Sequence, residues 1–467
     1  MKKKLFVGGA VFLLLVGLVA VTSLVVFSQD GQKQFYVGVT YCGRSIQEAK
    51  DLIDQVKDYT NLFILQSGTL KNTAEVEEIG DYAIAANLHF AFCNTRTIFP
   101  SPYSSDNSSY IVSTTIESND WSNGTFLIGG DNVPAGVRTN ELANAAKERW
   151  GERFIGVYYE DELGGKMLDI LVDLKGAQKS STGVITVRNT DAEFSYYPNG
   201  EISVWTNLET THYYPNGTIT LGIANDDFYT SENITKYNQP LKSYEQILEQ
   251  NPIKNYDDAA QMFIDTNKAQ LERIDKAQLS KADILVFSAD YGLYWWDYQS
   301  GYDVVLAELG WNNTVEQEIG LVRGAANLQG KSWGTILTWT YTHPPYLTNG
   351  EAMYQQMRAS YEAGAEYVII FNYSENSAEP NTLQEEHFLA LERFWKDVVQ
   401  NPAVLQGGVK AEAALVLPRN YGWGMRNPHD TIWGIWSADD VSQEIWNQLQ
   451  SKIDQYGLKL DIVFEDP

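Results

Sequence analysis

Three successive carboxylates, Glu160, Asp161 and Glu162, follow an apolar run in the sequence FIGVYYEDELGG, residues 154–165. The run has the composition of a strand that is buried on both faces. Where such a strand leaves the core, neighbouring carboxylates repel one another, and burial raises the pKa of at least one of them toward neutrality. A carboxyl group with that pKa can serve as a general acid. A solvated acidic turn is the alternative interpretation.

A further carboxylate, Glu308, lies near the end of the apolar run VVLAEL. Burying it is costly unless it has a chemical role or a partner, and an ion pair with Arg96 or another cation is the structural alternative. If the earlier strand continues through the acidic triplet, Glu160 and Glu162 point to one side and Asp161 to the other. We expect Glu162 to face Glu308, with Asp161 as the second choice. The candidate catalytic residues are therefore Glu162, Glu308, Asp161 and Glu160.

Eight apolar runs, with helical patterns between them, would position these carboxylates. A strand followed by a helix, repeated along the chain, is the pattern of βαβ units in a parallel sheet. The predicted strands are residues 35–41, 61–66, 89–94, 154–160, 284–289, 303–309, 334–341 and 367–372. We predict an α/β fold, a (β/α)₈ barrel over residues 30–408, whose active residues lie at the carboxyl ends of the strands.

Helical patterns lie between and after these runs, and Ser45 is placed to cap the first of them. The predicted helices are residues 45–59, 73–86, 140–150, 315–328, 351–363 and 383–400, with more than one helix within 243–282. Residues 95–136 are rich in Ser, Asn, Pro and Gly and too long for an ordinary connection. They indicate a functional loop, such as a lid, after the third strand.

Polar and aromatic side chains collect at the predicted carboxyl ends of the strands. They include Tyr41, Gln66, His343 and Glu375, and Trp296 lies nearby. The residues that we expect to bind a substrate there are Asn94, Arg96, Asp290, Trp295, Trp311, Trp339, Tyr341 and Asn372. Cleavage of a glycosidic bond requires two carboxylates across such a mouth, one to protonate the leaving oxygen and one to stabilise or attack the sugar cation.

Two segments depart from the barrel pattern. Residues 182–223 alternate apolar and polar side chains and contain YYPNG twice, at 196–200 and 213–217. Asn-Gly between alternating runs is a strong hairpin signal, so we predict a small antiparallel insertion after strand four. The insertion could supply aromatic residues that bind sugar, or it could be a solvent-facing meander with a structural role. We favour the structural role.

Residues 409–467 form the second of these segments. The pattern is strand, glycine-rich loop, helix and strand, at residues 413–418, 420–430, 439–456 and 458–464. This is one βαβ unit, a partial flavodoxin-like domain, and two parallel strands cannot cover both of their faces. Either the unit packs on the barrel or the sequence is a piece of a longer protein. We favour the interpretation that the sequence is a piece of a longer protein. The exposure of Val463 in the last strand distinguishes the two interpretations.

Tryptophans and an arginine mark the loop of this segment. Trp423, Arg426 and Trp433 could reach the mouth of the barrel from there, but a domain interface is the use that we favour for them.

The run YYEDELGG resembles the strand-four Asp-Glu-Pro signature of several sugar-acting barrels, with Asp161 and Glu162 at the matching positions and Leu163 in place of proline. The order of barrel and carboxyl-terminal segment is similar to glycoside hydrolases in which a flavodoxin-like, glutamine-amidotransferase-like domain follows the barrel, as in certain beta-galactosidases. Well-known retaining members carry a nucleophile on strand seven, and GTILTWTY has none. Barrels that pair strands four and six are known among alpha-galactosidase-like enzymes, so the pair Glu162 and Glu308 is possible.

Composition narrows the partners. A net charge of −26 and a pI of about 4.5 argue against nucleic acid and anionic surfaces as ligands. Aromatic residues make up 13% of the chain and permit stacking on sugar rings. The sequence contains no CxxC, no HExxH and no cluster of histidines, so neither a metal site, a cofactor nor a metal-dependent deacetylase is predicted.

The amino terminus predicts export. Residues 5–27 are uncharged, follow Lys2, Lys3 and Lys4, and are long enough to cross a bilayer, so we interpret residues 1–29 as a signal anchor with Ser28 onward outside the cell. Cleavage would instead give a secreted protein. Six glycosylation sequons, at Asn107, Asn123, Asn216, Asn233, Asn312 and Asn372, agree with export. Cys42 and Cys93 would allow one extracellular disulfide, although strands two apart are separated by about 10 Å.

Two functions therefore stand. The first is an extracellular, membrane-anchored glycoside hydrolase acting on oligo- or polysaccharide, with no nucleic-acid partner. The second is a non-catalytic barrel that binds glycan or forms part of the cell surface.

Overall fold

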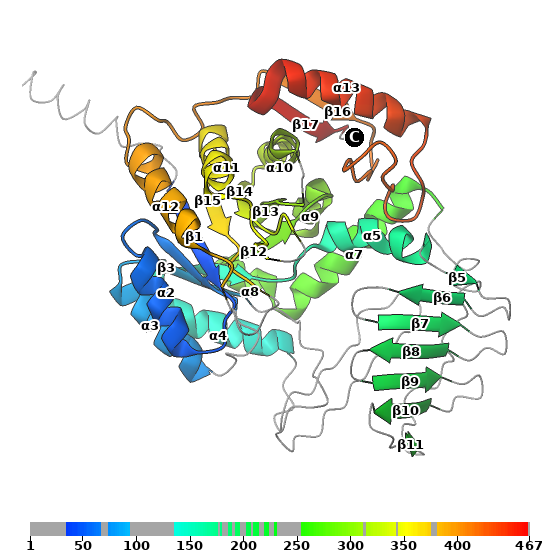
Figure 1. The fold of residues 1–467 in the computed structure, drawn as a ribbon, viewed down its shortest axis with the longest axis horizontal. Coiled ribbons are helices and arrows are strands. Elements are labelled where there is room, and N and C mark those ends of the chain that lie inside the picture. Colours follow the sequence, from blue (N-terminus) through cyan, green and yellow to red (C-terminus); the bar gives the residue numbers. More distant parts are fainter. Residues whose placement is uncertain are drawn as a thin grey trace, which may run out of the picture. The chain divides into compact units, whose positions relative to one another are not determined.

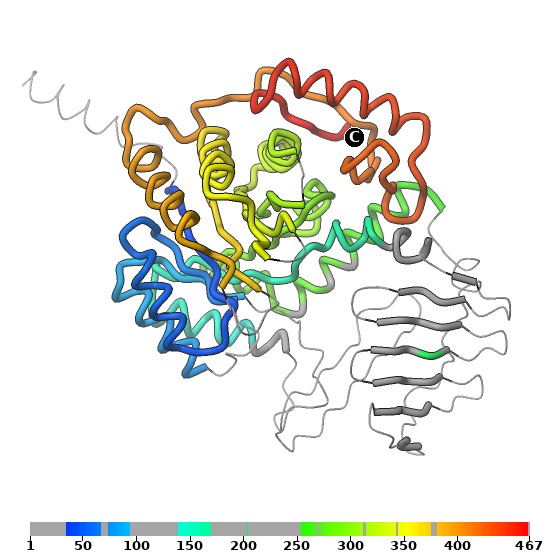
Figure 2. Tube along the Cα trace, in the orientation of Figure 1, coloured from blue at the N-terminus to red at the C-terminus, as the bar shows by residue number. Residues whose placement is uncertain are grey.

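The computed structural model describes residues 34–66, 73–93, 135–175, 254–311, 314–341, 344–374 and 381–465, and seven short strands between residues 178 and 230. The chain divides into two compact units, residues 1–35 and 36–467, and every element below belongs to the second (Figures 1 and 2). Within the described ranges, no helix is both long and apolar enough to cross a membrane. The predicted anchor, residues 5–27, lies outside them.

Eight parallel strands close into a barrel, which confirms the predicted (β/α)₈ fold (Figure 1). Around the barrel the order is β1, β15, β14, β13, β12, β4, β3, β2. The strands are β1 (Tyr36–Tyr41), β2 (Leu62–Leu65), β3 (His89–Cys93), β4 (Phe154–Tyr158), β12 (Leu285–Asp290), β13 (Val304–Leu309), β14 (Ser332–Leu337) and β15 (Tyr367–Ile370).

Alternate residues of these strands fill the barrel interior. Leu62 and Ile64 of β2 and Val304 and Leu306 of β13 belong to one buried cluster. Side chains on the other face of each strand pack against the surrounding helices, which is why each strand is almost entirely apolar.

The helices are α2 (Ile46–Val56), α3 (Thr73–Ala85), α4 (Ala135–Trp150), α5 (Leu163–Lys175), α7 (Tyr256–Arg273), α8 (Lys276–Lys281), α9 (Tyr294–Ser300), α10 (Val315–Gln329), α11 (Gly350–Ala363), α12 (Glu385–Phe394) and α13 (Asp440–Tyr456). Ser45 caps α2 as predicted, since its hydroxyl accepts a hydrogen bond from the Glu48 amide at 3.2 Å. A π-helix, Trp395–Val399, continues α12, and short 3₁₀ turns precede β4 and β17.

Several elements differ from the sequence predictions. Neither α5 nor α9 was predicted, and β14 ends at Leu337 rather than at residue 341. Trp339 and Tyr341 therefore lie on the loop that follows β14, still at the carboxyl end of the barrel. The predicted loop 95–136 lies almost entirely outside the described residues.

Residues 178–230 contain a seven-stranded antiparallel sheet in the order β11 to β5. Its strands are β5 (Gln178–Lys179), β6 (Ile185–Arg188), β7 (Ala192–Tyr196), β8 (Ile202–Thr206), β9 (Glu209–Tyr213), β10 (Ile219–Ile223) and β11 (Phe228–Thr230). Each YYPNG sequence joins two paired strands, with Tyr196 opposite Ile202 and Tyr213 opposite Ile219. The sheet extends beyond the predicted limits of 182–223.

The carboxyl-terminal segment packs on the barrel. Strands β16 (Ala413–Leu417) and β17 (Leu460–Phe464) pair in parallel, and α13 connects them. The other edge of β17 lies against α10, where Arg323 donates to the carbonyls of Leu458 and Leu460 and pairs with Asp461 at 2.7 Å. Val463, whose exposure distinguishes a covered strand edge from an open one, is only partly exposed. The flavodoxin-like relationship of this unit stays a prediction.

Candidate active site

The alternation of β13 carries Glu308 into the barrel. Val304 and Leu306 point to the interior, so Glu308 follows them at the carboxyl end. Only 4% of its surface is exposed, and its Oε2 has no hydrogen-bond partner among the described residues. Burial raises the pKa of Glu308 well above its ordinary value, and the charges of Glu162 and Asp161 raise it further. The surroundings of this carboxyl group therefore favour its neutral form.

The acidic triplet leaves β4 through a sharply bent backbone. Glu160 and Glu162 have φ values of 61° and 54°, which no extended strand adopts. The strand ends at Tyr158, so the condition for the expected alternation is not met. Glu160 lies near Tyr302 and helps to raise its pKa, whereas the other two carboxylates interact with Glu308.

Asp161 is held by two groups. It accepts a hydrogen bond from the Tyr158 hydroxyl, and its carbonyl oxygen accepts one from Lys166 Nζ at 2.7 Å. Burial raises the pKa of Asp161, while the Tyr158 hydrogen bond and the Lys166 charge oppose the rise. Tyr158 was missing from the sequence prediction, although it is the last inward residue of β4.

Glu162 is accessible to solvent, with 31% of its side chain exposed. Burial raises its pKa to about 7, and the charges of Asp161, Asp290 and Asp169 contribute, against the opposing charge of Lys166 at 3.9 Å. A carboxyl group with this pKa can both hold and release a proton near neutral pH. The mouth therefore combines two partly exposed acids, Asp161 and Glu162, with the buried Glu308.

Asp290 was predicted to bind substrate, but the structure uses it to hold α5. Its carboxylate is fully buried and accepts hydrogen bonds from the amides of Gly164, Gly165 and Tyr291, the last two at 2.8 Å. A side chain at Gly165 would meet the Tyr291 ring, with Cβ 2.0 Å from the nearest atom, which explains the glycines that follow the triplet. Asp290 thus fixes the start of α5 directly after Glu162.

Aromatic residues from three adjacent strand ends form a shelf at the mouth. We call Trp311, Trp339 and Tyr373 the aromatic shelf. The rings of Trp339 and Tyr373 stack at 5.8 Å with 3° between their planes, and Trp339 Nε1 donates to the Tyr373 carbonyl at 2.9 Å. The Trp311 ring lies 6.1 Å from that of Trp339. Trp311 and Tyr373 are 39% and 38% exposed, and Tyr341 beside them is 45% exposed.

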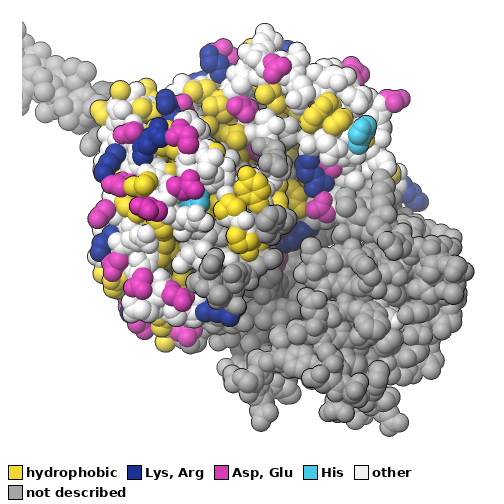
Figure 3. Space-filling view, in the orientation of Figure 1, with side chains coloured by type: hydrophobic (Ala, Val, Ile, Leu, Met, Phe, Trp, Pro, Cys, Tyr) yellow, Lys and Arg dark blue, Asp and Glu magenta, His cyan; other side chains and the backbone are white. Residues whose placement is uncertain are grey.

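Exposed aromatic faces of this kind suit the apolar faces of sugar rings. Figure 3 shows one face of the molecule, on which hydrophobic side chains gather in patches among acidic and basic ones. Tyr373 was not predicted, because it follows the end of β15 in a segment with no apolar pattern. Trp311, Trp339 and Tyr341 remain proposed substrate contacts.

Two other predicted contacts are buried. Trp295 is 5% exposed because it belongs to α9 and packs on Phe464 of β17 at 5.8 Å, so it offers no face to a ligand. Asn372 is fully buried, and its amide bonds to Asn381, Thr382 and Leu383, which tie down the segment after β15. The burial of Asn372 also argues against glycosylation of its sequon.

Several other predicted positions cannot be placed at the mouth. Asn94, Arg96, His343 and Glu375 lie outside the described residues.

Both cysteines are free thiols, so the optional disulfide is not formed. Burial raises the pKa of Cys42 to about 12, and its Sγ lies 3.5 Å from the Thr40 hydroxyl. In the described part of the chain, no three His, Cys, Asp or Glu side chains are grouped to hold a metal ion.

The raised carboxyl pKa values predict a pH-dependent stability. Burial raises the pKa of Asp290 to about 6 and that of Glu318, which accepts from Tyr294 at 2.6 Å, to about 8. In the unfolded chain both titrate near pH 4. Their stabilising contribution is complete below that pH and is lost as the pH rises through the folded values.

We therefore expect the free energy of unfolding to fall by on the order of a few kcal/mol between about pH 4 and pH 8. Urea unfolding at pH 5 and pH 8 measures the change. Glu318→Gln, which cannot ionise, should show a weaker pH dependence than the wild type. Equal stability at both pH values would contradict the raised pKa values.

No family model matches the sequence, and no curated protein matches it either. Among solved structures, a beta-galactosidase from Rahnella sp. R3 superposes with a TM-score of 0.50 at 10% identity, over 94% of this chain and 66% of that one. The GH5_18 protein from Streptomyces cattleya, solved in complex with GlcNAc, gives 0.46 at 10% identity, over 93% and 94% of the two chains. This chain thus spans about two thirds of the length of the beta-galactosidase. The likeness to that enzyme is one of fold, the (β/α)₈ barrel.

Proposed function

We propose that the protein is a glycoside hydrolase that acts on oligo- or polysaccharide. The observation that carries this proposal is the position of Glu162, Asp161 and Glu308 at the carboxyl end of a barrel, next to the exposed aromatic shelf. The shelf supplies stacking surface for sugar rings, and the carboxyl groups supply the proton transfer and charge stabilisation that cleavage of a glycosidic bond needs. The shared barrel fold agrees with this function.

Glu162 is the proposed general acid. Its exposure lets a glycosidic oxygen reach it, and its pKa of about 7 keeps it largely protonated at mildly acidic pH. Glu308 is the proposed partner. Burial favours the neutral form of its carboxyl group, and the positive charge that develops on the sugar ring in the transition state would favour its ionised form. We expect the two carboxyl groups to lie roughly 5 to 10 Å apart.

The test is a screen of the purified protein, residues 30–467, against chromogenic glycosides and defined oligosaccharides between pH 5 and pH 8. Because Glu162 must be protonated, kcat/KM should fall tenfold per pH unit above its pKa. No turnover of any glycoside, together with binding of a glycan, would replace hydrolysis by the second candidate below.

A non-catalytic glycan-binding barrel is the second candidate, and the burial of Glu308 is the observation that favours it. A carboxyl group that is 4% exposed, and whose neutral form is favoured by burial, is a poor nucleophile toward a sugar in the ground state. The aromatic shelf alone would suffice for binding.

Under either function, Trp339→Ala should weaken glycan binding. Trp339 contacts both other rings of the shelf. Its removal therefore deletes one stacking face and also the ring that stacks on Tyr373. We expect a loss of roughly tenfold or more in affinity, since an aromatic contact of this kind contributes about 1 to 2 kcal/mol. Isothermal titration with an oligosaccharide ligand measures it. Trp333→Phe, a conservative change at a buried tryptophan within β14, is the control.

We also propose that residues 5–27 anchor the protein, with the barrel outside the cell. The length of the apolar run and the preceding lysines support this location. Sequencing of the native amino terminus tests it, because a mature chain that begins near Ser28 would make the protein secreted.

A further inference from the structure

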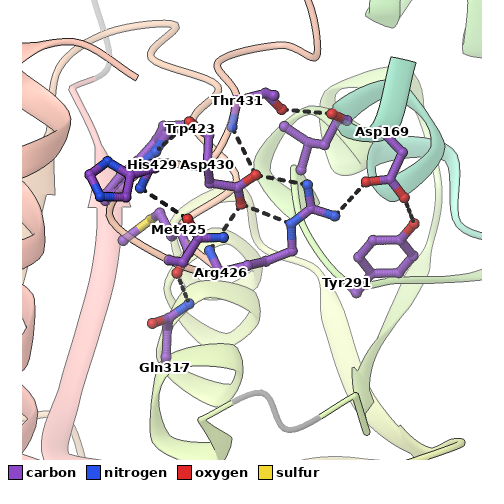
Figure 4. A network of polar contacts seen from close by, with 11 residues as sticks. Asp169, Tyr291, Gln317, Trp423, Met425, Arg426, His429, Asp430 and Thr431 are labelled. Carbon is purple, nitrogen blue, oxygen red and sulfur yellow. Dashed lines mark hydrogen bonds and ion pairs between the residues drawn. The ribbon is translucent and has the colours of Figure 1, made fainter. Parts of the chain in front are cut away.

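The carboxyl-terminal loop, residues 420–437, docks on the helix that follows the proposed acid. Arg426 of this loop lies between two carboxylates (Figure 4). Its Nη2 is 2.8 Å from Asp430 Oδ1, within the same loop, and its Nη1 is 2.7 Å from Asp169 Oδ1 on α5. The second oxygen of Asp169 accepts a hydrogen bond from the Tyr291 hydroxyl at 2.8 Å. One guanidinium group thus joins the loop to α5.

The loop also contacts the backbone of α5 at the two preceding residues. The Thr431 hydroxyl donates to the Leu168 carbonyl at 2.6 Å. Gly434 has a φ of 61°, and a Cβ built there would be only 1.7 Å from the Met167 carbonyl oxygen. Three consecutive residues of α5, 167 to 169, are therefore held by the loop.

We propose that Arg426 is a positioning residue of the active site, which holds α5 and pairs the charge of Asp169 beside Glu162. The proposal rests on the proposed function only in calling Glu162 the acid. α5 begins at Leu163, directly after Glu162, so that a shift of the helix moves this carboxyl group. The described part of the chain offers one further cation here, Lys166, which lies on α5 itself.

The charges around Glu162 set the direction of the expected effects. The groups that act on it or share its cluster are Tyr158, Asp161, Lys166, Asp169, Asp290, Tyr291 and Glu308, with Arg426 bound to Asp169. Asp169 favours the neutral form of Glu162, and the bound guanidinium offsets part of that influence. Loss of Arg426 should raise the pKa of Glu162, whereas loss of the Asp169 charge should lower it.

The experiment measures the pKa of Glu162 in the full chain, from the carboxyl ¹³C shift of labelled protein, with Glu162→Gln to assign the signal. Arg426→Met should raise this pKa by roughly half a unit, and Asp169→Asn should lower it by a similar amount. Both changes break the same ion pair, so a purely structural role would move the pKa in one direction. Shifts of the same sign, or no shift, overturn the charge-pairing role.

Arg393→Met is the matched control. Arg393 also pairs with a carboxylate, Glu351 at 2.6 Å, and lies 3.7 Å from a tyrosine ring centroid, that of Tyr354, but on a surface remote from the site. This variant deletes the same kinds of contact, and the pKa of Glu162 should stay at its wild-type value.

Hydrogen exchange tests the mechanical part separately. In Arg426→Met, and in Gly434→Ala, amides of residues 160–169 should exchange roughly tenfold faster than in Arg393→Met and Gly457→Ala. Gly457 also has a positive φ, of 50°, but a Cβ there meets nothing within 4 Å. Wild-type exchange in residues 285–309 shows that the variants are folded. Equal exchange of residues 160–169 in all four variants overturns the positioning role.

Neither readout needs a substrate. If no glycoside is hydrolysed but the pKa shifts and the faster exchange are found, the proposed function fails and the positioning of Glu162 stands. If hydrolysis is found and the readouts are unchanged, the positioning role alone fails.

Discussion

Replacing Glu308 by Gln is expected to lower turnover by roughly 10²- to 10⁴-fold, and Glu162→Gln should do the same. Each residue acts mainly in the transition state, where one donates a proton and the other stabilises positive charge, so the loss should fall on kcat more than on KM. Because burial favours the neutral form of Glu308, the amide should replace it with little loss of stability. Steady-state kinetics on the best glycoside, with thermal unfolding in parallel, measures both quantities.

Glu318→Gln provides the matched control. Glu318 is also a buried glutamate with a raised pKa, but it lies on α10 and hydrogen-bonds Tyr294. We expect its substitution to leave turnover within a few-fold of the wild type. Normal activity in either Glu162→Gln or Glu308→Gln would exclude that residue from catalysis, and a structure with the two carboxyl groups more than about 12 Å apart would exclude the pair.

The barrel could be predicted because its strands are continuous apolar runs of four to six residues, which a strand buried on both faces requires. Helix α9, with the sequence YWWDYQS, could not be predicted from the sequence. It is one turn longer than a minimal helix and buried nearly all round, so it has no polar face and no amphipathic period. Trp295 was therefore assigned to the mouth, although the helix turns it toward β17.

The sequence predicted which residues lie at the site better than it predicted what each of them does. Positive φ values at Glu160 and Glu162 cannot be foreseen for residues other than glycine, and they undo the simple alternation of a strand. Asp290 and Asn372 occupy strand ends as expected, but buried polar groups there serve backbone amides as readily as a ligand. Only the geometry separates those two uses.

The contacts between the carboxyl-terminal loop and α5 join residues more than 250 positions apart, as in the pair Asp169 and Arg426. No local pattern reports such a pairing. The tryptophans of the loop do pack against the barrel, because Trp433 and Trp296 of α9 lie with ring centroids 4.6 Å apart.

Removal of the contact between Trp433 and Trp296 gives the largest expected effect on stability. Trp433→Ala should lower the free energy of unfolding by about 3 to 5 kcal/mol. Trp433 is fully buried, packs on Trp296 of α9 and Phe263 of α7, and donates from Nε1 to the Asn420 carbonyl at 2.8 Å. No smaller side chain fills this space, so the substitution leaves a cavity between the loop and the barrel.

The same contact predicts that the barrel and the carboxyl-terminal segment unfold together. Urea unfolding followed by far-ultraviolet circular dichroism should show one transition for residues 36–467 in the wild type, at a lower midpoint in Trp433→Ala. Trp311→Ala is the control, because its ring is 39% exposed and its loss should cost less than about 1 kcal/mol. Two separate transitions, of which only the first responds to Trp433→Ala, would mean that the segment is an independent domain, and Arg426 could then release α5 without unfolding the barrel.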